Sequence, residues 1–198
     1  MKAIVVRQLW ATLIALEIKT IETRPAPPNG PMRPDGVRGL PGLPVERGER
    51  IAIVAGARRP SGHGDHYGEW RLSLGESVPI IHALSLPYRW HPLPLGAVVC
   101  TVQVDDALPI VDEWKGAGVS QRFLVSNGRT LALVDAASYG PVSGSFTPQL
   151  PLGDFTPGRW GWLLSDPQPC TPIPCKGRQG VFRLPDDVTE ALGQEVGA

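Results

Sequence analysis

The sequence predicts an α+β fold: a small antiparallel β-barrel with short flanking helices and long inserted loops. Three observations lead to this prediction. The 198-residue chain has 23 glycines and 22 prolines, contents above the average that favour turns and loops over long helices. About seven apolar runs with strand character outnumber two or three short helical patterns. Turn residues rather than long helical crossovers join these runs, which favours an antiparallel barrel over a parallel sheet.

The first three elements lie within residues 1–24. Residues 3–6 form an apolar run rich in β-branched side chains, which is typical of a strand. Between residues 9 and 18 apolar side chains recur at helical spacing, which predicts a helix. Residues 22–24 begin a second strand, and the prolines and glycines that follow predict a long loop over residues 25–47.

Two further strands flank a second irregular stretch, residues 57–94. Residues 50–55 (RIAIVA) alternate and then run apolar between glycines, as a half-buried strand does. Residues 96–104 (GAVVCTVQV) form the next run with strand character. Residues 121–125 and 130–134 flank an Asn-Gly pair that tolerates the positive φ angles of tight turns, which predicts a β-hairpin.

The last elements lie near the carboxyl end. Residues 160–164 (WGWLL) and 180–184 (GVFRL) are predicted strands, joined by a connection rich in proline and cysteine. Residues 186–192 are predicted to form a short helix with Asp187 near its start. With 42% hydrophobic residues the chain can bury one sizeable core. We therefore expect a single domain over residues 1–198, with insertions at about 25–47, 57–94 and 107–150.

Charge and cysteine content limit the possible partners and compartments. Nineteen basic residues balance nineteen acidic ones, so no global field attracts the chain to nucleic acid or to a membrane. A nucleic-acid contact would be local, and arginines crowd between Arg24 and Arg59, although a solvated loop explains them equally well. The three cysteines are odd in number and lack the spacing of a zinc site, so reduced thiols are expected. Arg7 and Gln8 interrupt the first apolar run, and no stretch is long enough to cross a membrane, which predicts a soluble cytoplasmic protein.

No cofactor or metal site is expected. The sequence has no glycine-rich phosphate loop with lysine, no nucleophile elbow and no dinucleotide-binding fingerprint, which argues against ATP-driven and NAD-dependent chemistry. His63, Asp65 and His66 form a metal-like cluster, yet no second anchored motif accompanies it. A metal site formed by these three residues is kept as an alternative.

Several segments of the chain carry a family resemblance. They read VRQLWATLIALEIKTIETR, RGERIAIVAG, LGAVVCTVQVDD, LGDFTPGRWGWLL and PIPCKGRQGVFRL, and lie within residues 1–24, 47–56, 95–106 and 152–184. Together and in this order they resemble the ASCH family, relatives of the PUA RNA-binding domain. The resemblance implies a PUA-like β-barrel with a cleft where the junction at Lys19 approaches the last hairpin. It also implies RNA binding or processing or, as in one subgroup, hydrolysis of the amide of acetylcytidine.

Two residues depart from the pattern of that family. Leu9 stands where a proline is usual at the helix start, a position that other helix formers also occupy. Glu22 stands three residues after Lys19, where the amidohydrolase subgroup has a nucleophilic threonine, with Thr20 and Thr23 on either side. A carboxylate there could act as a general base on water, with Lys19 stabilising the developing negative charge.

The segment that begins at Lys19 also predicts a site without reference to any family. Alternation along a strand places Glu22 and Arg24 on one face and Thr23 on the other. Because Lys19 lies at the junction between helix and strand, its side chain can approach Glu22, so three charges can converge on one cleft. The alternative is an ion-pair cluster that closes the mouth of the barrel and has no further role.

Further candidate ligand contacts flank this segment. Arg7, Gln8 and Trp10 lie between the first strand and the helix, where a guanidinium and an indole can hold phosphate and stack on bases, although Trp10 also fits a core position. Turn residues expose Asp154 and Arg159, so Asp154 is either a second acid–base group or a side chain that bonds its own turn. The remaining candidates, as a stacking surface or as contacts to phosphate and base edges, are Trp160, Lys176 and Gln179.

Three classes of function remain open. The leading hypothesis is a protein that binds RNA or a modified nucleotide in the barrel cleft, with stacking by Trp10 or Trp160 and polar contacts from the Lys19–Arg24 segment. The first alternative is a hydrolase, either a ribonuclease or a nucleobase amidohydrolase, that uses Lys19, Glu22 and Asp154. The second is an interaction module that binds another protein through loops 25–47 or 57–94.

Overall fold

The structure is a computed structural model that describes residues 1–28, 43–58, 93–116, 119–126, 129–134 and 153–196. Most of the predicted loops 25–47 and 57–94 therefore lie outside the described residues. The same holds for the predicted metal-like cluster His63, Asp65 and His66, and for the turn residues Asn127 and Gly128. Within the described part, no helix is both long enough and apolar enough to pass through a lipid bilayer.

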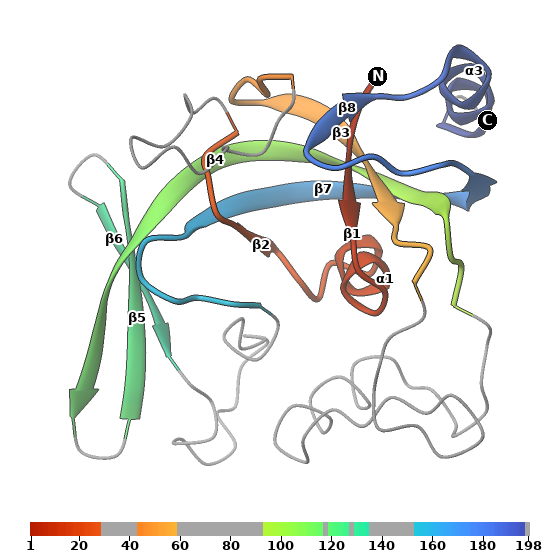
Figure 1. Ribbon diagram of the computed structural model, residues 1–198. Helices are drawn as coiled ribbons and strands as arrows, with labels where there is room; N and C mark the ends of the chain where they lie inside the picture. Colours follow the sequence, from red (N-terminus) through yellow and green to blue (C-terminus); the bar gives the residue numbers. More distant parts are fainter. Residues whose placement is uncertain (29–42, 59–92, 117–118, 127–128, 135–152, 197–198) are drawn as a thin grey trace, which may run out of the picture.

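The described chain forms a curled mixed sheet with two short helices (Figure 1). The sheet path runs β2–β7–β4–β3–β1–β8, and the β5–β6 hairpin extends from the far part of β4. The elements are β1 (Lys2–Val6), α1 (Trp10–Ala15), β2 (Ile21–Arg24), β3 (Glu49–Ala55), β4 (Ala97–Gly116), β5 (Val119–Ser126), β6 (Arg129–Val134), β7 (Trp160–Pro174), β8 (Val181–Arg183) and α3 (Asp186–Val196).

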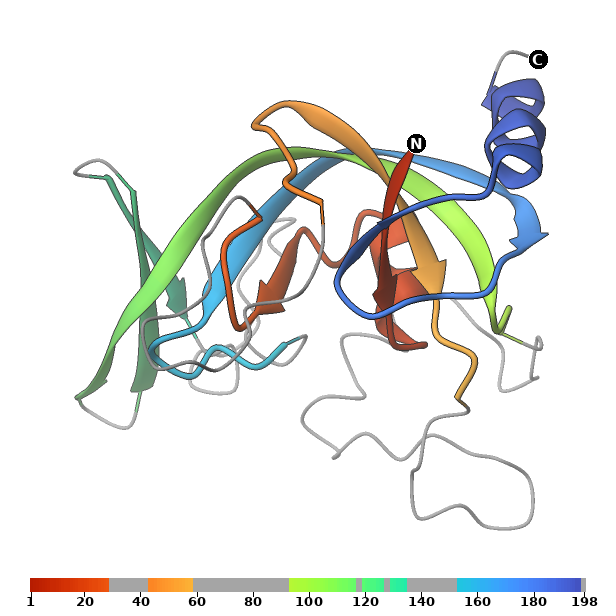
Figure 2. The ribbon, with the colours of Figure 1, turned by 45° about the horizontal axis from the view of Figure 1, so that its top comes forward.

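The sheet curls into a half-barrel, with β4 and β7 arching over β1, β2 and α1 (Figure 2). Their register shifts at three places, between Val98 and Cys100, between Thr101 and Gln103, and between Val104 and Asp106. Such bulges bend a strand and increase its twist, which lets two long strands curve instead of staying flat. The prediction of a small α+β barrel is confirmed at this coarse level.

The prediction of a purely antiparallel barrel is wrong, because β1 and β3 run parallel. Their register pairs Ala3 with Ala52 and Val6 with Ala55. Between these strands the chain passes through α1 and β2, and a crossover of this kind is what parallel neighbours require. The other recorded strand pairs of the sheet are antiparallel.

Two predicted boundaries differ from the structure because neighbouring strands decide them. β4 continues beyond residue 104 as far as Gly116, and β7 runs through the proline- and cysteine-rich stretch that was expected to be a connection. β2 pairs with β7 only from Trp160 to Leu163, so the rest of β7 lies along β4 alone on the described path. Proline lacks a main-chain N–H, so a strand accepts it where no neighbouring strand needs that donor. This explains how the segment stays extended despite its prolines.

The predicted hairpin near residue 127 is confirmed. β5 and β6 pair antiparallel, with Ser126 opposite Arg129. This hairpin and the second half of β4 lie inside residues 107–150, where an insertion was predicted. The single-domain boundary over residues 1–198 stays a prediction.

Apolar residues pack on both sides of the sheet. Ala11 and Ile14 of α1 pack in a buried cluster with Ile4, Ile53 and Trp162, so the larger core lies between the concave face and α1. On the other side, Val188 and Leu192 of α3 pack with a second buried cluster that includes Ala3, Ala52 and Phe182. Successive residues of β1 and β3 thus pack into the two cores in turn, because side chains alternate between the faces of a strand and both faces are covered here.

Candidate functional site

The end of α1 positions Lys19. Glu17 adopts a left-handed conformation with φ of 59°, directly after the helix C-cap at Leu16. The Ile18 amide donates to Leu13 O at 2.9 Å and the Glu17 amide to Ile14 O at 3.0 Å, the two hydrogen bonds of a Schellman motif. This ending shortens the predicted helix and turns the chain directly into β2.

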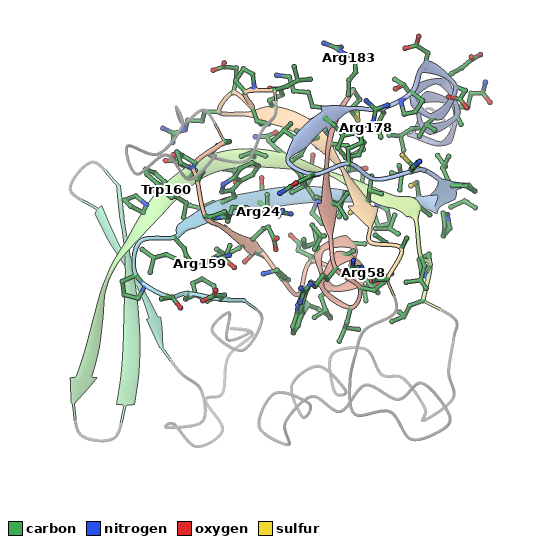
Figure 3. All side chains as sticks on the ribbon, in the orientation of Figure 1. Arg24, Arg58, Arg159, Trp160, Arg178 and Arg183 are labelled. Carbon is green, nitrogen blue, oxygen red and sulfur yellow. The ribbon has the colours of Figure 1, made fainter. Side chains whose placement is uncertain are left out.

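Register with β7 shows which way the side chains of β2 point. Glu22 pairs with Trp162 and Arg24 with Trp160, and residues directly opposite in an antiparallel pair share a face. Trp162 is buried in the core under the sheet, so Glu22 and Arg24 lie on the concave face. Figure 3 shows Arg24, Arg159 and Trp160 grouped around β2.

Glu22 is the centre of a buried charge cluster. Its Oε2 atom lies 3.4 Å from Lys19 Nζ, and its Oε1 atom lies 3.1 Å from Arg24 Nε. The exposed fractions of the three side chains are 1% for Lys19, 11% for Glu22 and 15% for Arg24. Arg24 Nε is buried without an aligned hydrogen bond, so its contact with Glu22 is an ion pair only. The structure therefore brings these three predicted residues together; their role in binding or catalysis stays a prediction.

Burial shifts the pKa of Lys19. Removal of the ammonium from water lowers the pKa of Lys19, an effect that the Glu22 carboxylate opposes through charge and hydrogen bonding. The Arg24 guanidinium adds to the lowering. Lys19 is thus more readily deprotonated than a lysine in water.

Arg24 also links the two ends of the curled sheet. Its Nη2 atom donates a hydrogen bond of 2.7 Å to Val5 O in β1. Val6 O accepts from the Gly56 amide and points toward β3, so Val5 O points to the opposite edge of β1. On that edge β8 pairs only with Lys2, Ala3 and Ile4. Arg24 therefore donates to the carbonyl of the β1 residue that follows the last residue paired with β8.

Two further cations cover the edge of β2 that faces away from β7. Lys19 Nζ donates to Ile21 O at 2.5 Å, and Arg159 Nη2 donates to Thr23 O at 3.3 Å. Thr20 O accepts from the Leu164 amide and faces β7, so by alternation the carbonyls of Ile21 and Thr23 face outward. Cationic side chains on an edge strand hinder pairing with another chain.

Asp154 does not join the Glu22 cluster. Its amide donates to Thr23 Oγ1 at 3.1 Å, and Thr23 points away from Glu22 because the two residues alternate along β2. Asp154 Oδ1 accepts from the amide and hydroxyl of Thr156, and Oδ2 lies 3.3 Å from Arg159 Nε. Bonds to a residue two positions ahead are those of an Asx-type turn, the alternative left open for this residue.

Gly153 is a close neighbour that sequence reasoning did not select. A Cβ atom at this position would lie 3.1 Å from Thr23 Oγ1 and 3.3 Å from Lys19 Nζ. The loop before β7 thus approaches both Lys19 and the outer face of β2. Because the approach depends on how the loop packs, the sequence carries no signal for it beyond a glycine in a turn.

The candidates around the start of α1 have different environments. Gln8 is buried, its Oε1 accepts from the Thr12 amide and hydroxyl, and its Nε2 donates to Pro94 O at 2.7 Å. The polar groups of Gln8 therefore hold the start of the helix. Trp10 is half-buried and packs against two apolar clusters, whereas Arg7 is exposed.

The remaining candidates lie at the rim or on the other side of the sheet. Trp160 is half-buried at the edge of the larger core. Lys176 and Gln179 are exposed in the turn between β7 and β8. A Cβ on Gly177 in this turn would lie 2.5 Å from Val5 Cγ2, which places the turn against β1 and apart from Glu22.

Two other observations bear on ligands. A small pocket lined by Pro27, Val45, Arg47, Val104 and Asp106, among others, lies away from the Glu22 cluster. Among the described residues, no group of three or more His, Cys, Asp or Glu side chains could hold a metal ion.

Comparisons with known proteins leave the family open. No protein-family model matches the chain, and no curated protein matches it. An ASCH protein from Zymomonas mobilis, known from a crystal structure, matches over 98% of this chain and 93% of its own, with 16% identity and a TM-score of 0.43. At that score the match assigns neither fold nor activity, so the resemblance to the ASCH family stays a prediction.

Proposed function

We propose that the protein binds RNA or a modified nucleotide at the concave face of the curled sheet, with the base held at the Glu22 cluster. The observation that carries this proposal is the carboxylate of Glu22 fixed between Lys19 Nζ and Arg24 Nε, with Trp160 and Trp162 as the cross-strand neighbours on the same face. A fixed carboxylate can accept hydrogen bonds from the amino group of a base, as Asp and Glu do with cytosine N4.

The neighbouring groups supply the other contacts that a nucleotide needs. Trp160 is only half-buried, so part of its ring is available for stacking on a base. Arg24 offers a guanidinium beside Glu22, a group suited to phosphate or to a carbonyl oxygen. Neutral net charge favours recognition of this kind over non-specific binding to a phosphate backbone.

Calorimetric titration at low salt tests the proposal with cytidine monophosphate, its N4-acetyl derivative and short single-stranded RNA. We expect Glu22→Gln to weaken binding roughly tenfold or more, because one base hydrogen-bond pair is worth about 1–3 kcal/mol. Trp160→Ala, at the rim of the core, should weaken it by a similar factor. Circular dichroism melting of each variant checks folding. No measurable affinity of the wild-type protein for any of the three ligands would overturn the proposal.

A second candidate function is hydrolysis of a modified nucleobase. A buried lysine with a lowered pKa, 3.4 Å from a carboxylate, is an arrangement suited to proton transfer. Thr23 does not substitute for the threonine nucleophile of the amidohydrolase subgroup, because its side chain lies on the other face of β2 and bonds the Asp154 amide. The proposed set is therefore Lys19 and Glu22, without Asp154.

Chromatographic assay of N4-acetylcytidine after incubation with the protein tests this second function. Glu22→Gln should abolish turnover while the melting curve stays cooperative. Turnover that persists unchanged in this variant would remove Glu22 from the mechanism.

A further inference from the structure

Four exposed cations lie on three chain segments that meet at Val5, near the carboxyl end of β1. Arg7 directly follows β1, and Arg58 lies three residues after the end of β3. Lys176 and Arg178 lie in the turn between β7 and β8. All four side chains are exposed. These four residues are called the basic patch below.

Close packing on Val5 brings the three segments together. A Cβ atom on Gly56 would lie 3.6 Å from Val5 Cγ1 and 3.8 Å from Arg7 Cα. A Cβ atom on Gly177 would lie 2.5 Å from Val5 Cγ2, closer than real Cβ atoms approach, so glycine is needed there. Val5 is therefore covered from two sides by the chain that carries Arg58 and by the turn that carries Lys176 and Arg178.

Main-chain hydrogen bonds fix the same arrangement. The Cys175 amide donates to Gly96 O at 2.8 Å, and the Gly96 amide donates to Ala55 O at 2.9 Å. This chain of bonds ties the start of the basic turn to the last residue of β3. The Gly56 amide donates to Val6 O at 2.8 Å, which holds the segment before Arg58 beside the end of β1.

No salt bridge among the described residues neutralises the charge of the basic patch. In the part of the chain that the structure describes, none of the four side chains forms an ion pair with a carboxylate. Burial and, to a smaller degree, the carboxylate of Asp187 at the start of α3 raise the pKa of Cys175, the residue before Lys176. Exposed cations fixed on neighbouring segments suit a partner with several negative charges.

The basic patch and the Glu22 cluster meet at Val5 but lie on different sides of the sheet, because the Val5 side chain packs in the cluster that α3 covers, whereas Glu22 lies on the concave face. Val5, on which Gly56 and Gly177 pack, is also the residue whose carbonyl accepts from Arg24. Arg24 in turn is paired with Glu22. A polynucleotide with one base at Glu22 would pass over the edge of β1 at Val5 O to bring a neighbouring phosphate to these cations.

We propose that the basic patch binds the phosphate backbone of single-stranded RNA, so that the protein recognises a polymer rather than a free nucleotide. This inference rests on the proposed binding of a base at Glu22 and extends it to the nucleotides on one side of that base. Single-stranded RNA is favoured over a duplex because a base must be unstacked to reach the concave face.

Salt dependence of RNA binding tests the inference. Fluorescence anisotropy of a labelled oligocytidylate of about ten nucleotides is measured between about 50 and 200 mM salt. Each cation that neutralises a phosphate of a single strand contributes about 0.7 to the slope of log affinity against log salt. The double variant Arg58→Gln/Arg178→Gln should therefore lower the slope by about 1.4 and weaken binding at low salt. Its affinity for cytidine monophosphate should stay that of the wild type.

Two other exposed arginines provide a charge-matched control. Arg47 lies before the start of β3, at the other end of that strand from Arg58, and Arg183 pairs with Lys2 at the start of β1. The double variant Arg47→Gln/Arg183→Gln removes the same net charge and should keep the wild-type slope. Equal slopes for the two double variants would overturn the inference.

The outcomes separate this inference from the proposed function. Wild-type protein that binds cytidine monophosphate but shows no gain in affinity for the oligocytidylate would refute the basic patch and leave the base site intact. Failure to bind either ligand would refute both. Tighter binding to phosphatidylglycerol vesicles than to RNA, lost in Arg58→Gln/Arg178→Gln, would assign the patch to a membrane surface instead and so contradict the inference.

Discussion

Arg24 Nη2 donates a hydrogen bond of 2.7 Å to the main-chain oxygen of Val5, and thereby joins β2 at one end of the sheet path to β1 near the other. The same guanidinium is 3.1 Å from Glu22 at Nε. One side chain thus connects the carboxylate of the candidate site with the strand on which the basic patch is built. Loss of Arg24 should therefore lower both the stability of the protein and its affinity for a ligand.

Arg24→Ala should destabilise the protein by about 3 kcal/mol, because Glu22 then keeps only Lys19 as a cationic partner and the carbonyl of Val5 loses its donor. Arg24→Lys should recover only part of this loss, since a single ammonium lacks the fork that reaches both groups. Urea unfolding measures the change. Arg47→Ala is the control: the Arg47 side chain is 74% exposed in its pair with Asp106, and its removal should cost no more than about 0.5 kcal/mol. Equal stability of the two alanine variants would contradict the structural role of Arg24.

Stability should rise with pH in the alkaline range because of Lys19. Burial lowers the pKa of Lys19 in the folded protein below the ordinary lysine value of 10.5, so the unfolded chain binds more protons between the two values. The free energy of unfolding therefore gains from Lys19 as pH rises through this window, and the gain is complete above 10.5. The free energy of unfolding is measured for the wild-type protein and for Lys19→Met at several pH values. The wild-type value minus the Lys19→Met value should increase as pH rises. A difference that is constant with pH would contradict the lowered pKa.

Gly153→Ala should destabilise the protein by about 1–3 kcal/mol, since the added methyl group would be 3.1 Å from Thr23 Oγ1, 3.2 Å from Phe155 Cε2 and 3.3 Å from Lys19 Nζ. Gly193→Ala is a matched control on the exposed side of α3, where a Cβ meets no atom within 4 Å. Alanine should stabilise that helix by up to about 1 kcal/mol. Thermal melting reports both changes. A Gly153→Ala variant as stable as the wild-type protein would contradict the prediction, because it would show that the loop before β7 shifts at little energetic cost.

Local patterns predicted most of the elements but not their partners. The runs at residues 3–6 and 50–55 each became a strand, and the Asn-Gly pair marked a true hairpin. The parallel pairing of β1 with β3 was not predictable in this way, because alternation along a strand does not reveal the direction of its neighbour. The extension of β7 through four prolines was missed for a related reason: an edge position, which makes proline acceptable, is set by where β2 ends.

In the candidate site, too, local patterns predicted some of the placements and only the tertiary structure determined the others. Spacing along β2 was enough to place Glu22 and Arg24 on one face and Thr23 on the other, since the pleat is a local property. The sequence also singled out Lys19 at the end of the helix. Only the tertiary structure decided that Arg24 reaches Val5 and that the Asp154 amide bonds Thr23 on the face of β2 away from Glu22. It also decided that the segments carrying Arg58 and Arg178 pack against Val5. These relationships join residues far apart in the chain, and they depend on how the sheet curls, which no local pattern encodes.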